Sequence, residues 1–420
     1  MKENSCQTVL RVLNKIIFVL IVSFCLASCT NYSEPSSRRT CEGDSLTGFN
    51  NSLSPLSSVN TFDQSGDRNC SFLNSNFDYS FWELPVDKDP IPFYYKTNNY
   101  LDAKMNCIMK NSFVETGITF SFITDLHLLD NSKSSKEIMK KVLDIGFVPF
   151  AICGGDIPSA FASGAGCAEV DCYAQIKEWN SWVMHWGEDR VYQLRGNHDY
   201  VVNEIGNDDY FRISEAGTYK QIMTFIENKV NVGNPHSEYY YFDILSQKMR
   251  FIIIDAHVYT DVSPNVVANY FNQNQINWLL NVLDNSNGLD TIIVSHEPCN
   301  KNMSGYSDNM SVLHSVAESF KNKGVFSGIY SGVSWNHDFS NSTGDLICIL
   351  SGHSHQDESS LLNNVLSIST TCDAMYDEDN LARVRGTISE IAFDVFSIDT
   401  TNRTIVTTRI GAGNDRIWNY

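Results

Sequence analysis

The stretch Ile349–Glu358, "ILSGHSHQDE", places two histidines, His353 and His355, directly after an apolar run that begins at Asp345 ("DLICILS"). The run predicts a buried strand. A strand that ends in Gly-His-Ser-His is suited to a sheet edge that presents side chains to a ligand, although short His-x-His pairs also occur in loops without any role. The rest of the chain decides between these two interpretations.

Four other apolar segments end in the same kind of polar side chain. They supply Asp125 and His127 after "ITFSFIT", Asp156 after "AICGG", Asn197, His198 and Asp199 after "VYQLRG", and His296 after "DTIIVS". In open α/β sheets, ligand sites gather at the carboxyl ends of strands, so five such endings predict one shared site. Asp, Asn and His side chains suit Mn, Fe, Zn or Co. Seven metal-binding side chains are too many for one tetrahedral ion, and they are about the number that two ions require.

The strands alternate with helical patterns, which predicts an α/β domain. Apolar residues recur at helical spacing in residues 135–146, 173–187 and 272–286, between the strand-like segments. With 420 residues, of which 42% are hydrophobic, the chain can build a substantial core. Its net charge of -19 argues against binding of duplex nucleic acid, because such binding requires positive side chains that neutralise the phosphates. A small phosphorylated substrate stays compatible with this charge, because a metal site supplies positive charge locally.

The N-terminus predicts export. A basic lead precedes the apolar segment 16–27, which is short for a membrane span and ends in "LASC" at Cys29. This ending resembles the lipobox of bacterial lipoproteins, and the resemblance implies cleavage of residues 1–28 as a signal peptide and a lipid on Cys29. An uncleaved short anchor or an ordinary signal peptide are the alternatives. We therefore expect a lipid-anchored protein of the bacterial cell envelope, on the periplasmic face or the cell surface.

Composition divides the remainder into three parts. Residues 29–76 are rich in Ser, Asn and Pro and predict a flexible tether. Residues 77–116 hold an aromatic segment and a helix that we expect to pack on the main domain, residues 117–420. Nine cysteines follow Cys29, so at least one is unpaired or pairs between chains. Cys167 and Cys172 are close enough in sequence for a local disulfide.

The order Asp-x-His, Gly-Asp, Gly-Asn-His-Asp, His, Gly-His-x-His resembles the calcineurin-like metallophosphoesterase family, and the resemblance covers residues 117–420. It implies a four-layer sandwich of two mixed β-sheets flanked by helices. It also implies two metal ions with one bridging carboxylate. The implied ligands of the first ion are Asp125, His127 and His355, those of the second are Asn197, His296 and His353, and Asp156 bridges both.

The resemblance further implies hydrolysis of a phosphomonoester or phosphodiester by metal-bound hydroxide, outside the cytoplasm. His198 would protonate the leaving group, and Asp199 would orient His198 through a hydrogen bond. Arg195 is compatible with either a phosphate contact or a structural salt bridge. Ser159 stands where the family often has Asp or Asn, which puts substrate placement or metal tuning in doubt.

Two alternative functions stay open at this level. One is a nuclease-type phosphodiesterase, which the acidic chain disfavours for long nucleic acids. The other is a non-catalytic metal-containing binding lipoprotein, which the intact ligand set and His198 disfavour. Specificity for the substrate is expected in loops such as residues 300–342.

Overall fold

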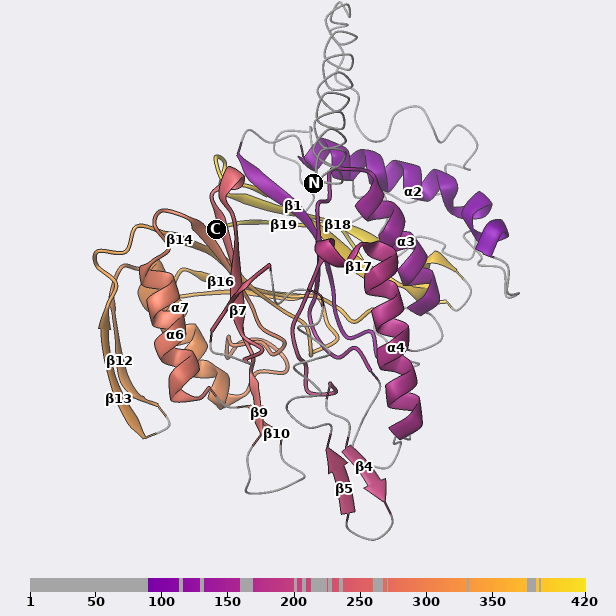
Figure 1. Cartoon of the computed structure of the whole chain (residues 1–420). Helices are drawn as coiled ribbons and strands as arrows, with labels where there is room; N and C mark the ends of the chain where they lie inside the picture. The colour runs from indigo at the N-terminus through magenta and orange to yellow at the C-terminus, as the bar shows by residue number, and fades with distance from the viewer. Residues whose placement is uncertain are drawn as a thin grey trace, which may run out of the picture. The chain divides into compact units, whose positions relative to one another are not determined.

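The computed structural model describes residues 90–112, 116–128, 132–158, 169–199, 202–205, 209–212, 225, 229–233, 237–259, 267–269, 271–330, 332–375, 383–384 and 387–420. The predicted signal peptide, the lipidated Cys29 and Ser159 lie outside these residues. Within them, two mixed sheets pack face to face, and helices cover the outer face of each (Figure 1). The predicted fold class, an α/β sandwich of two mixed sheets with flanking helices, is confirmed.

The first sheet has six strands, and the three strands at one side of it are parallel. Its order is β19 (Arg416–Asn419), β18 (Thr404–Gly411), β17 (Ala392–Asp399), β1 (Gly117–Ile123), β2 (Ala151–Cys153) and β3 (Val191–Gln193). Strands β1, β2 and β3 run parallel, whereas β17, β18 and β19 extend the sheet in antiparallel fashion. The carboxyl ends of β1, β2 and β3 therefore meet at one edge.

The second sheet has seven strands and the same mixed character. Its order is β15 (Glu358–Leu362), β16 (Val365–Ser369), β14 (Asp345–Ser351), β11 (Asp290–Val294), β8 (Met249–Ile253), β7 (Tyr240–Ile244) and β6 (Asn231–Val232). Strands β16, β14, β11 and β8 are parallel, and antiparallel strands close both sides. A second set of strand ends thus meets at one edge.

The core between the sheets follows from the alternation of side chains along each strand. Ile118, Phe120 and Phe122 of β1 point into it and meet aromatic rings from the opposite sheet. The Phe120 ring lies 5.1 Å from that of Phe251 in an edge-on contact, a favoured geometry for aromatic pairs. Because helices cover the other face as well, β1 is buried on both sides, as parallel strands usually are.

Helices α2 (Pro90–Ser112), α3 (Ser132–Asp144) and α4 (Glu169–Trp186) pack on the six-stranded sheet, and α6 (Gln273–Asp284) and α7 (Ser311–Lys321) pack on the seven-stranded sheet. Helix α4 buries three tryptophans, Trp179, Trp182 and Trp186, against α3 and the sheet. Short 3-10 turns occur at η2 (Glu188–Arg190), η3 (Leu245–Gln247), η4 (Asp308–Met310) and η5 (Ile388–Glu390).

Helix α2 contacts the C-terminal strands. The Tyr100 hydroxyl accepts a hydrogen bond from the backbone N–H of Gly411 at 2.8 Å. The buried Lys104 ammonium lies 2.6 Å from the carboxylate of Asp415. In the described part of the chain, no helix has the length and apolar character needed to cross a membrane.

Among the described residues, three pairs of antiparallel strands lie outside the two sheets: β4 (Val202–Ile205) with β5 (Asp209–Arg212), β9 (His257–Tyr259) with β10 (Val267–Asn269), and β12 (Val325–Tyr330) with β13 (Val333–Asp338). Residues 300–342, expected to be loops, thus contain a helix and a hairpin. The hairpin forms because Phe326 and Trp335 are buried in the core beside α6 and α7. His337 of this hairpin lies 2.9 Å from Asp284, away from the predicted site residues.

The five cysteines whose side chains the structure describes fall into two classes. Cys107 of α2 is disulfide-bonded. Cys153, Cys299, Cys348 and Cys372 are buried and unpaired. The suggested disulfide between Cys167 and Cys172 lies outside the described side chains.

Candidate metal centre

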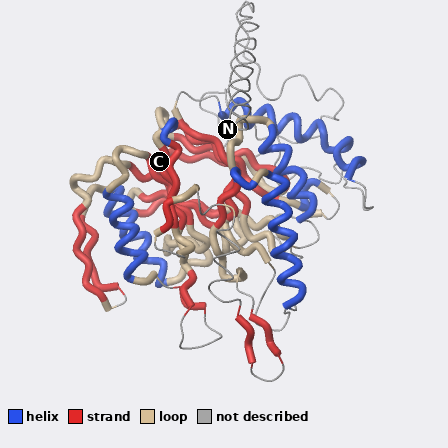
Figure 2. Tube along the Cα trace, viewed as in Figure 1, coloured by secondary structure: helices blue, strands red, loops and turns tan. Residues whose placement is uncertain are grey.

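The loops that follow five parallel strands meet where the two sheets face each other. Figure 2 shows loops gathered at one end of both sheets. Strands β1, β2 and β3 deliver Asp125, His127, Asp156, Asn197 and His198, and strands β11 and β14 deliver His296, His353 and His355. All seven predicted metal ligands therefore come together, although they are spread over 231 positions of the sequence.

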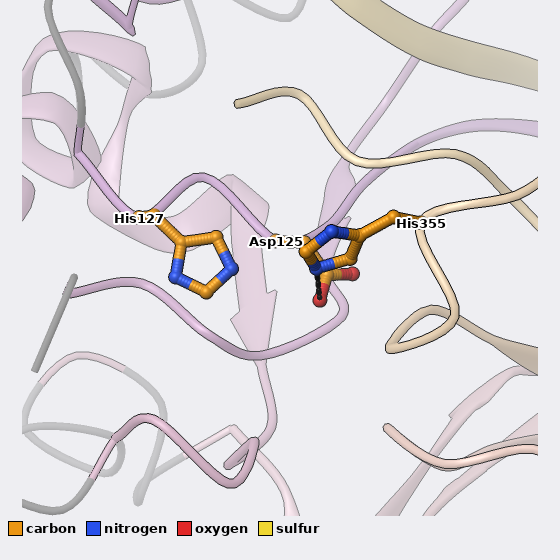
Figure 3. A group of neighbouring side chains, drawn as sticks. All are labelled: Asp125, His127 and His355. Atoms are coloured by element: carbon orange, nitrogen blue, oxygen red, sulfur yellow. Dashed lines mark ion pairs between the residues drawn. The ribbon is translucent and has the colours of Figure 1, made fainter. Parts of the chain in front are cut away.

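Asp125, His127 and His355 form what we term the first ligand group (Figure 3). One potential ligand atom from each residue lies within 4.8 Å of the others. His355 Nε2 lies 3.3 Å from Asp125 Oδ1. Asp125 Oδ2 accepts hydrogen bonds from the Thr124 hydroxyl at 2.7 Å and from the backbone N–H of His353 at 2.9 Å. These bonds fix the carboxylate so that Oδ1 is directed at the imidazole.

Asn197, His296 and His353 form the second ligand group. Asn197 Oδ1 lies 2.8 Å from His353 Nδ1 and 3.1 Å from His296 Nε2. His296 Nδ1 lies 2.7 Å from the carbonyl oxygen of Gly154 and donates to it, so Nε2 is the ring nitrogen that faces the other ligands. One amide oxygen and two imidazole nitrogens thus converge on a single point.

Asp156 lies between the two groups. Its Oδ2 is 3.2 Å from His296 Nε2 and 3.9 Å from both His127 Nε2 and His198 Nε2. Its Oδ1 accepts the backbone N–H of His198 at 2.6 Å. One buried carboxylate oxygen therefore faces imidazoles of both groups, which is the geometry that a bridging ligand requires.

The backbone around the site is held in an unusual conformation. Five of the ligands have positive φ: Asp125 (52°), His127 (46°), Asp156 (54°), His353 (67°) and His355 (54°). Residues other than glycine rarely adopt this region, and such strain, about 1–3 kcal/mol each, gathers at functional sites. Glycines permit the close packing: a Cβ on Gly196 would overlap Asp156, and one on Gly352 would overlap Thr124.

The two buried carboxylates are kept ionised by the surrounding imidazoles. Burial alone would raise the pKa of Asp125, but His296 and His355 outweigh it and hold that pKa at about 2. At Asp156, burial is likewise opposed by His296, His198 and His127, and the pKa falls further below its ordinary value. Ionised oxygens directed at imidazoles are the form in which carboxylates bind cations.

The imidazoles divide into two kinds in the metal-free protein. Burial lowers the pKa of His127 and of His353 to about 4, so both are neutral near pH 7. Burial would also lower the pKa of His296, but Asp156 and Asp125 raise it to about 10. Because a proton on His296 balances the buried carboxylates, a cation that replaces this proton would find the opposing charge already in place.

The donor set fits transition-metal ions. Two carboxylates, an amide oxygen and four imidazoles are the ligand types that suit Mn, Fe, Zn or Co. Two buried anionic side chains in one site require positive charge beside them. The residues present therefore match the group that the sequence implies.

His198 and Asp199 lie beside this cluster. The His198 side chain is 21% exposed, and its ring centroid is 4.7 Å from that of His127. The Asp199 carboxylate accepts backbone N–H groups of Gly196 at 2.6 Å, Ile157 at 2.9 Å and Asp156 at 3.0 Å. Burial, together with the charge of Asp156, raises the pKa of Asp199 to about 7.

The role expected for Asp199 differs from what these contacts indicate. A hydrogen bond to His198 was expected, whereas the described contacts of the carboxylate tie the Gly196 turn to the backbone at Asp156. The reason is geometric: the turn after β3 aims the Asp199 side chain under its own backbone and toward the loop after β2. Asp199 therefore holds the loops that carry Asp156 and Asn197 in register.

Arg195 forms a buried salt bridge and makes no phosphate-binding surface. Its guanidinium, 3% exposed, lies 2.7 Å from Glu238 and 2.6 Å from Asp255. Asp255 follows β8 in the same polar-ending pattern that marks the ligands, yet it serves this ion pair. The alternative of a structural salt bridge at Arg195 is the one observed.

One further segment was missed from the sequence. Residues 370–374 ("TTCDA") follow β16, a parallel neighbour of β14, and lie beneath the first ligand group. Ala374 N–H donates to the carbonyl of Asp125 at 3.0 Å, and the Thr371 hydroxyl donates to the carbonyl of His355 at 3.0 Å. The signal was a sixth apolar strand with a polar ending.

Comparison with known proteins gives one family. The model of the calcineurin-like phosphoesterases matches residues 118–357, which include all seven ligands. No curated protein matches the chain in sequence.

Solved structures with a similar arrangement have low sequence identity. GAP50, the anchor in the inner membrane complex of Plasmodium, is 15% identical, with 70% of this chain and 84% of that chain covered and a TM-score of 0.39. The phosphopantetheinyl hydrolase of Mycobacterium tuberculosis is 14% identical, with 62% of this chain and 91% of that chain covered and a TM-score of 0.34.

Proposed function

The chain belongs to the calcineurin-like phosphoesterase family and is a metal-dependent hydrolase of phosphoric esters, and from this premise we propose that it hydrolyses a small phosphomonoester or phosphodiester at a pair of metal ions outside the cytoplasm. The observation that carries the two-ion proposal is Asp156, whose Oδ2 faces imidazoles of both ligand groups.

The two groups divide the ligands as the family resemblance implies. Asp125, His127 and His355 would hold one ion, Asn197, His296 and His353 the other, and Asp156 both. The bound cations would supply positive charge that lowers the pKa of water to about 7 and that neutralises phosphate oxygens in the transition state.

The protein's own residues supply orientation and proton transfer. His198 is partly exposed at the edge of the cluster and is held by its backbone N–H on Asp156 Oδ1. A protonated imidazole there would donate to the leaving oxygen of the ester, which develops negative charge as the bond breaks. Asp199 would support this step indirectly, by fixing the turn that carries His198.

A location outside the cytoplasm has two supports. The lipobox-like ending at Cys29 implies lipidation, and Cys107 is disulfide-bonded, which is typical of oxidising compartments. Replacing Cys29 with serine should move the chain from the membrane fraction to the soluble fraction of an expressing bacterium. Retention of the Cys29→Ser variant in the membrane would contradict the lipid anchor.

The reaction is tested with the full-length chain on a nitrophenyl phosphate monoester and the matching diester. Each assay is run with a chelator and then with added Mn²⁺, Zn²⁺ or Fe²⁺. We expect turnover only with metal, and the ratio of the two rates assigns monoester or diester preference. Stoichiometric binding of two ions without turnover of either ester would favour a non-catalytic binding lipoprotein.

A further inference from the structure

Asp357 lies two residues after the ligand His355, where the chain leaves the metal centre. Its Oδ1 accepts a hydrogen bond from Arg409 Nη2 at 2.6 Å and lies 2.8 Å from Arg416 Nη1. The same oxygen accepts the backbone N–H of Thr371 at 3.0 Å. The two arginines belong to β18 and β19 of the six-stranded sheet, whereas Thr371 follows β16 of the seven-stranded sheet. One carboxylate oxygen therefore joins both sheets directly beside the site.

The two arginines complete an ion cluster with Asp394 of β17. Arg409 Nε and Nη2 each lie 2.9 Å from a carboxylate oxygen of Asp394, and Arg416 Nη2 contacts the same carboxylate. The side chains of Arg409 and Asp394 have no exposed surface. Two guanidinium charges thus balance the carboxylates of Asp357 and Asp394, as burial of charge requires. The backbone makes room for the cluster at Gly413, where a Cβ would lie 2.6 Å from Arg409 Nη1.

Thr371 links this cluster to the main chain of His355. The Thr371 hydroxyl donates to the His355 carbonyl at 3.0 Å, while the backbone N–H of Thr371 donates to Asp357. Both ends of the segment 355–357 are therefore bound to one residue. His355 has a φ of 54°, and a residue other than glycine keeps this conformation only where the surrounding structure fixes it. The place of the Asp357 carboxylate thus determines the path of the backbone at His355.

We propose that Asp357 is a positioning residue for the metal ligand His355. Its carboxylate, fixed by the two guanidiniums and by the N–H of Thr371, holds the segment that directs His355 Nε2 at Asp125, 3.3 Å away (Figure 3). This inference rests on the proposed two-ion function and concerns only the first ligand group. Asp357 acts through the backbone of His355 and is not itself one of the ligands.

Loss of this support should weaken the first ion selectively. The ligands of the second group are held elsewhere: Asn197 and His296 follow other strands, and the backbone N–H of His353 is bound to Asp125 Oδ2 at 2.9 Å. Asp357→Asn keeps the size of the side chain and removes the charge that faces the guanidiniums. A residue that supports a metal ligand typically contributes 10–100-fold to metal affinity, so the first ion should bind about 10–100-fold more weakly.

Asp394→Asn is the matched control for this variant. It removes the same charge from the same ion cluster, and Asp394 contacts both arginines as Asp357 does. Asp394 lies within β17, however, and not on the segment that carries His355. If the cluster only stabilised the fold, the two variants would alter metal binding alike.

The measurement is equilibrium dialysis of the metal-free, full-length protein against rising concentrations of Mn²⁺, which gives an affinity for each ion. His355→Ala identifies the binding step that belongs to the first group. Denaturant unfolding of each metal-free variant reports its stability separately. We expect Asp357→Asn to weaken the first-group step about 10–100-fold with the other step unchanged, and Asp394→Asn to keep the wild-type affinity at both steps.

Three results would overturn the positioning role while leaving the proposed function intact: wild-type affinities in Asp357→Asn, equal weakening of both ions, or equal weakening in Asp394→Asn. Arg416→Gln replaces Asp357→Asn if the latter does not fold, because Arg416 lies on the edge strand β19 and supplies one of three donors to Asp357. It should weaken the same step, and an unchanged step would overturn the role. A wild-type chain that binds no ion would overturn the proposed function itself, and the inference with it.

Discussion

The two ligand groups are built from equivalent strand ends but are supported differently. In the second group, His296 is fixed by a main-chain carbonyl, and Asn197 Oδ1 lies between two imidazoles. In the first group, the His355 side chain is 35% exposed, whereas the His296 side chain of the second group is fully buried. A partly exposed ligand position can be reached by small molecules from solvent, and a fully buried one cannot. The first group is therefore the more accessible half of the site.

The largest effect is expected where the two groups meet. Asp156→Asn removes the negative charge that faces both ligand groups, so the protein should lose both metal ions. Metal-dependent hydrolysis should fall by more than about 100-fold, which exceeds the loss typical of a residue that only supports a ligand. Metal analysis and ester hydrolysis measure this, with the exposed Asp308→Asn as the control. Full activity in Asp156→Asn would remove the basis for treating the groups as one centre.

His198→Ala tests a residue that belongs to neither group. General acid catalysis contributes about 10²–10⁴-fold, so turnover of an alkyl phosphate should drop by about 10²-fold while metal content is retained. A nitrophenyl ester, whose leaving group needs little protonation, should be affected much less. Equal losses with both leaving groups would count against proton donation by His198.

Removal of one histidine from each group sharpens the contrast between them. His355→Ala opens a partly exposed position, so metal affinity should fall and added imidazole should restore part of it. His296→Ala leaves a fully buried space that imidazole cannot reach, and no recovery is expected. Titration with Mn²⁺ with and without imidazole measures both, and recovery in His296→Ala alone would reverse the comparison.

The pH dependence of stability probes the support beneath the first group. Burial raises the pKa of Asp373 to about 6, from 3.8 in the unfolded chain. The folded state therefore binds this proton more tightly, and the contribution to stability, full below pH 4, is lost as pH rises through 6. Asp373→Asn should remove up to about 3 kcal/mol of this decline in the metal-free protein.

Denaturant titrations from pH 4 to pH 8 make that measurement. The wild type should lose stability relative to Asp373→Asn across the window, with little further change above pH 7. Parallel curves for the two proteins would show that Asp373 is already ionised in the folded state.

Much of this arrangement could be predicted from the sequence because each ligand lies within a few residues of the strand that positions it. An apolar strand that ends in Asp, Asn or His can be recognised within about ten residues of sequence. Parallel strands bring such carboxyl ends together at one end of the sheet. The seven ligands and the two-sheet fold followed from that pattern and from the family resemblance.

What escaped prediction depends on contacts between distant segments. The bonds of Asp199 to the backbone of Asp156 and Ile157 depend on how two loops pack. A structural salt bridge at Arg195 was one of the two alternatives from the sequence, but its partners, Glu238 and Asp255, depend on how the two sheets pack. The contacts of Thr371 with the His355 carbonyl and of Ala374 with the Asp125 carbonyl arise only when β16 pairs with β14.

The most direct measurement is a titration of the metal-free, full-length chain with Mn²⁺, in which bound metal and ester hydrolysis are recorded on the same samples. Two ions per chain are predicted, with hydrolysis appearing as the second ion binds and absent from Asp156→Asn throughout. Hydrolysis that persists in chelator, or that reaches its maximum with one ion bound, would contradict the two-ion centre.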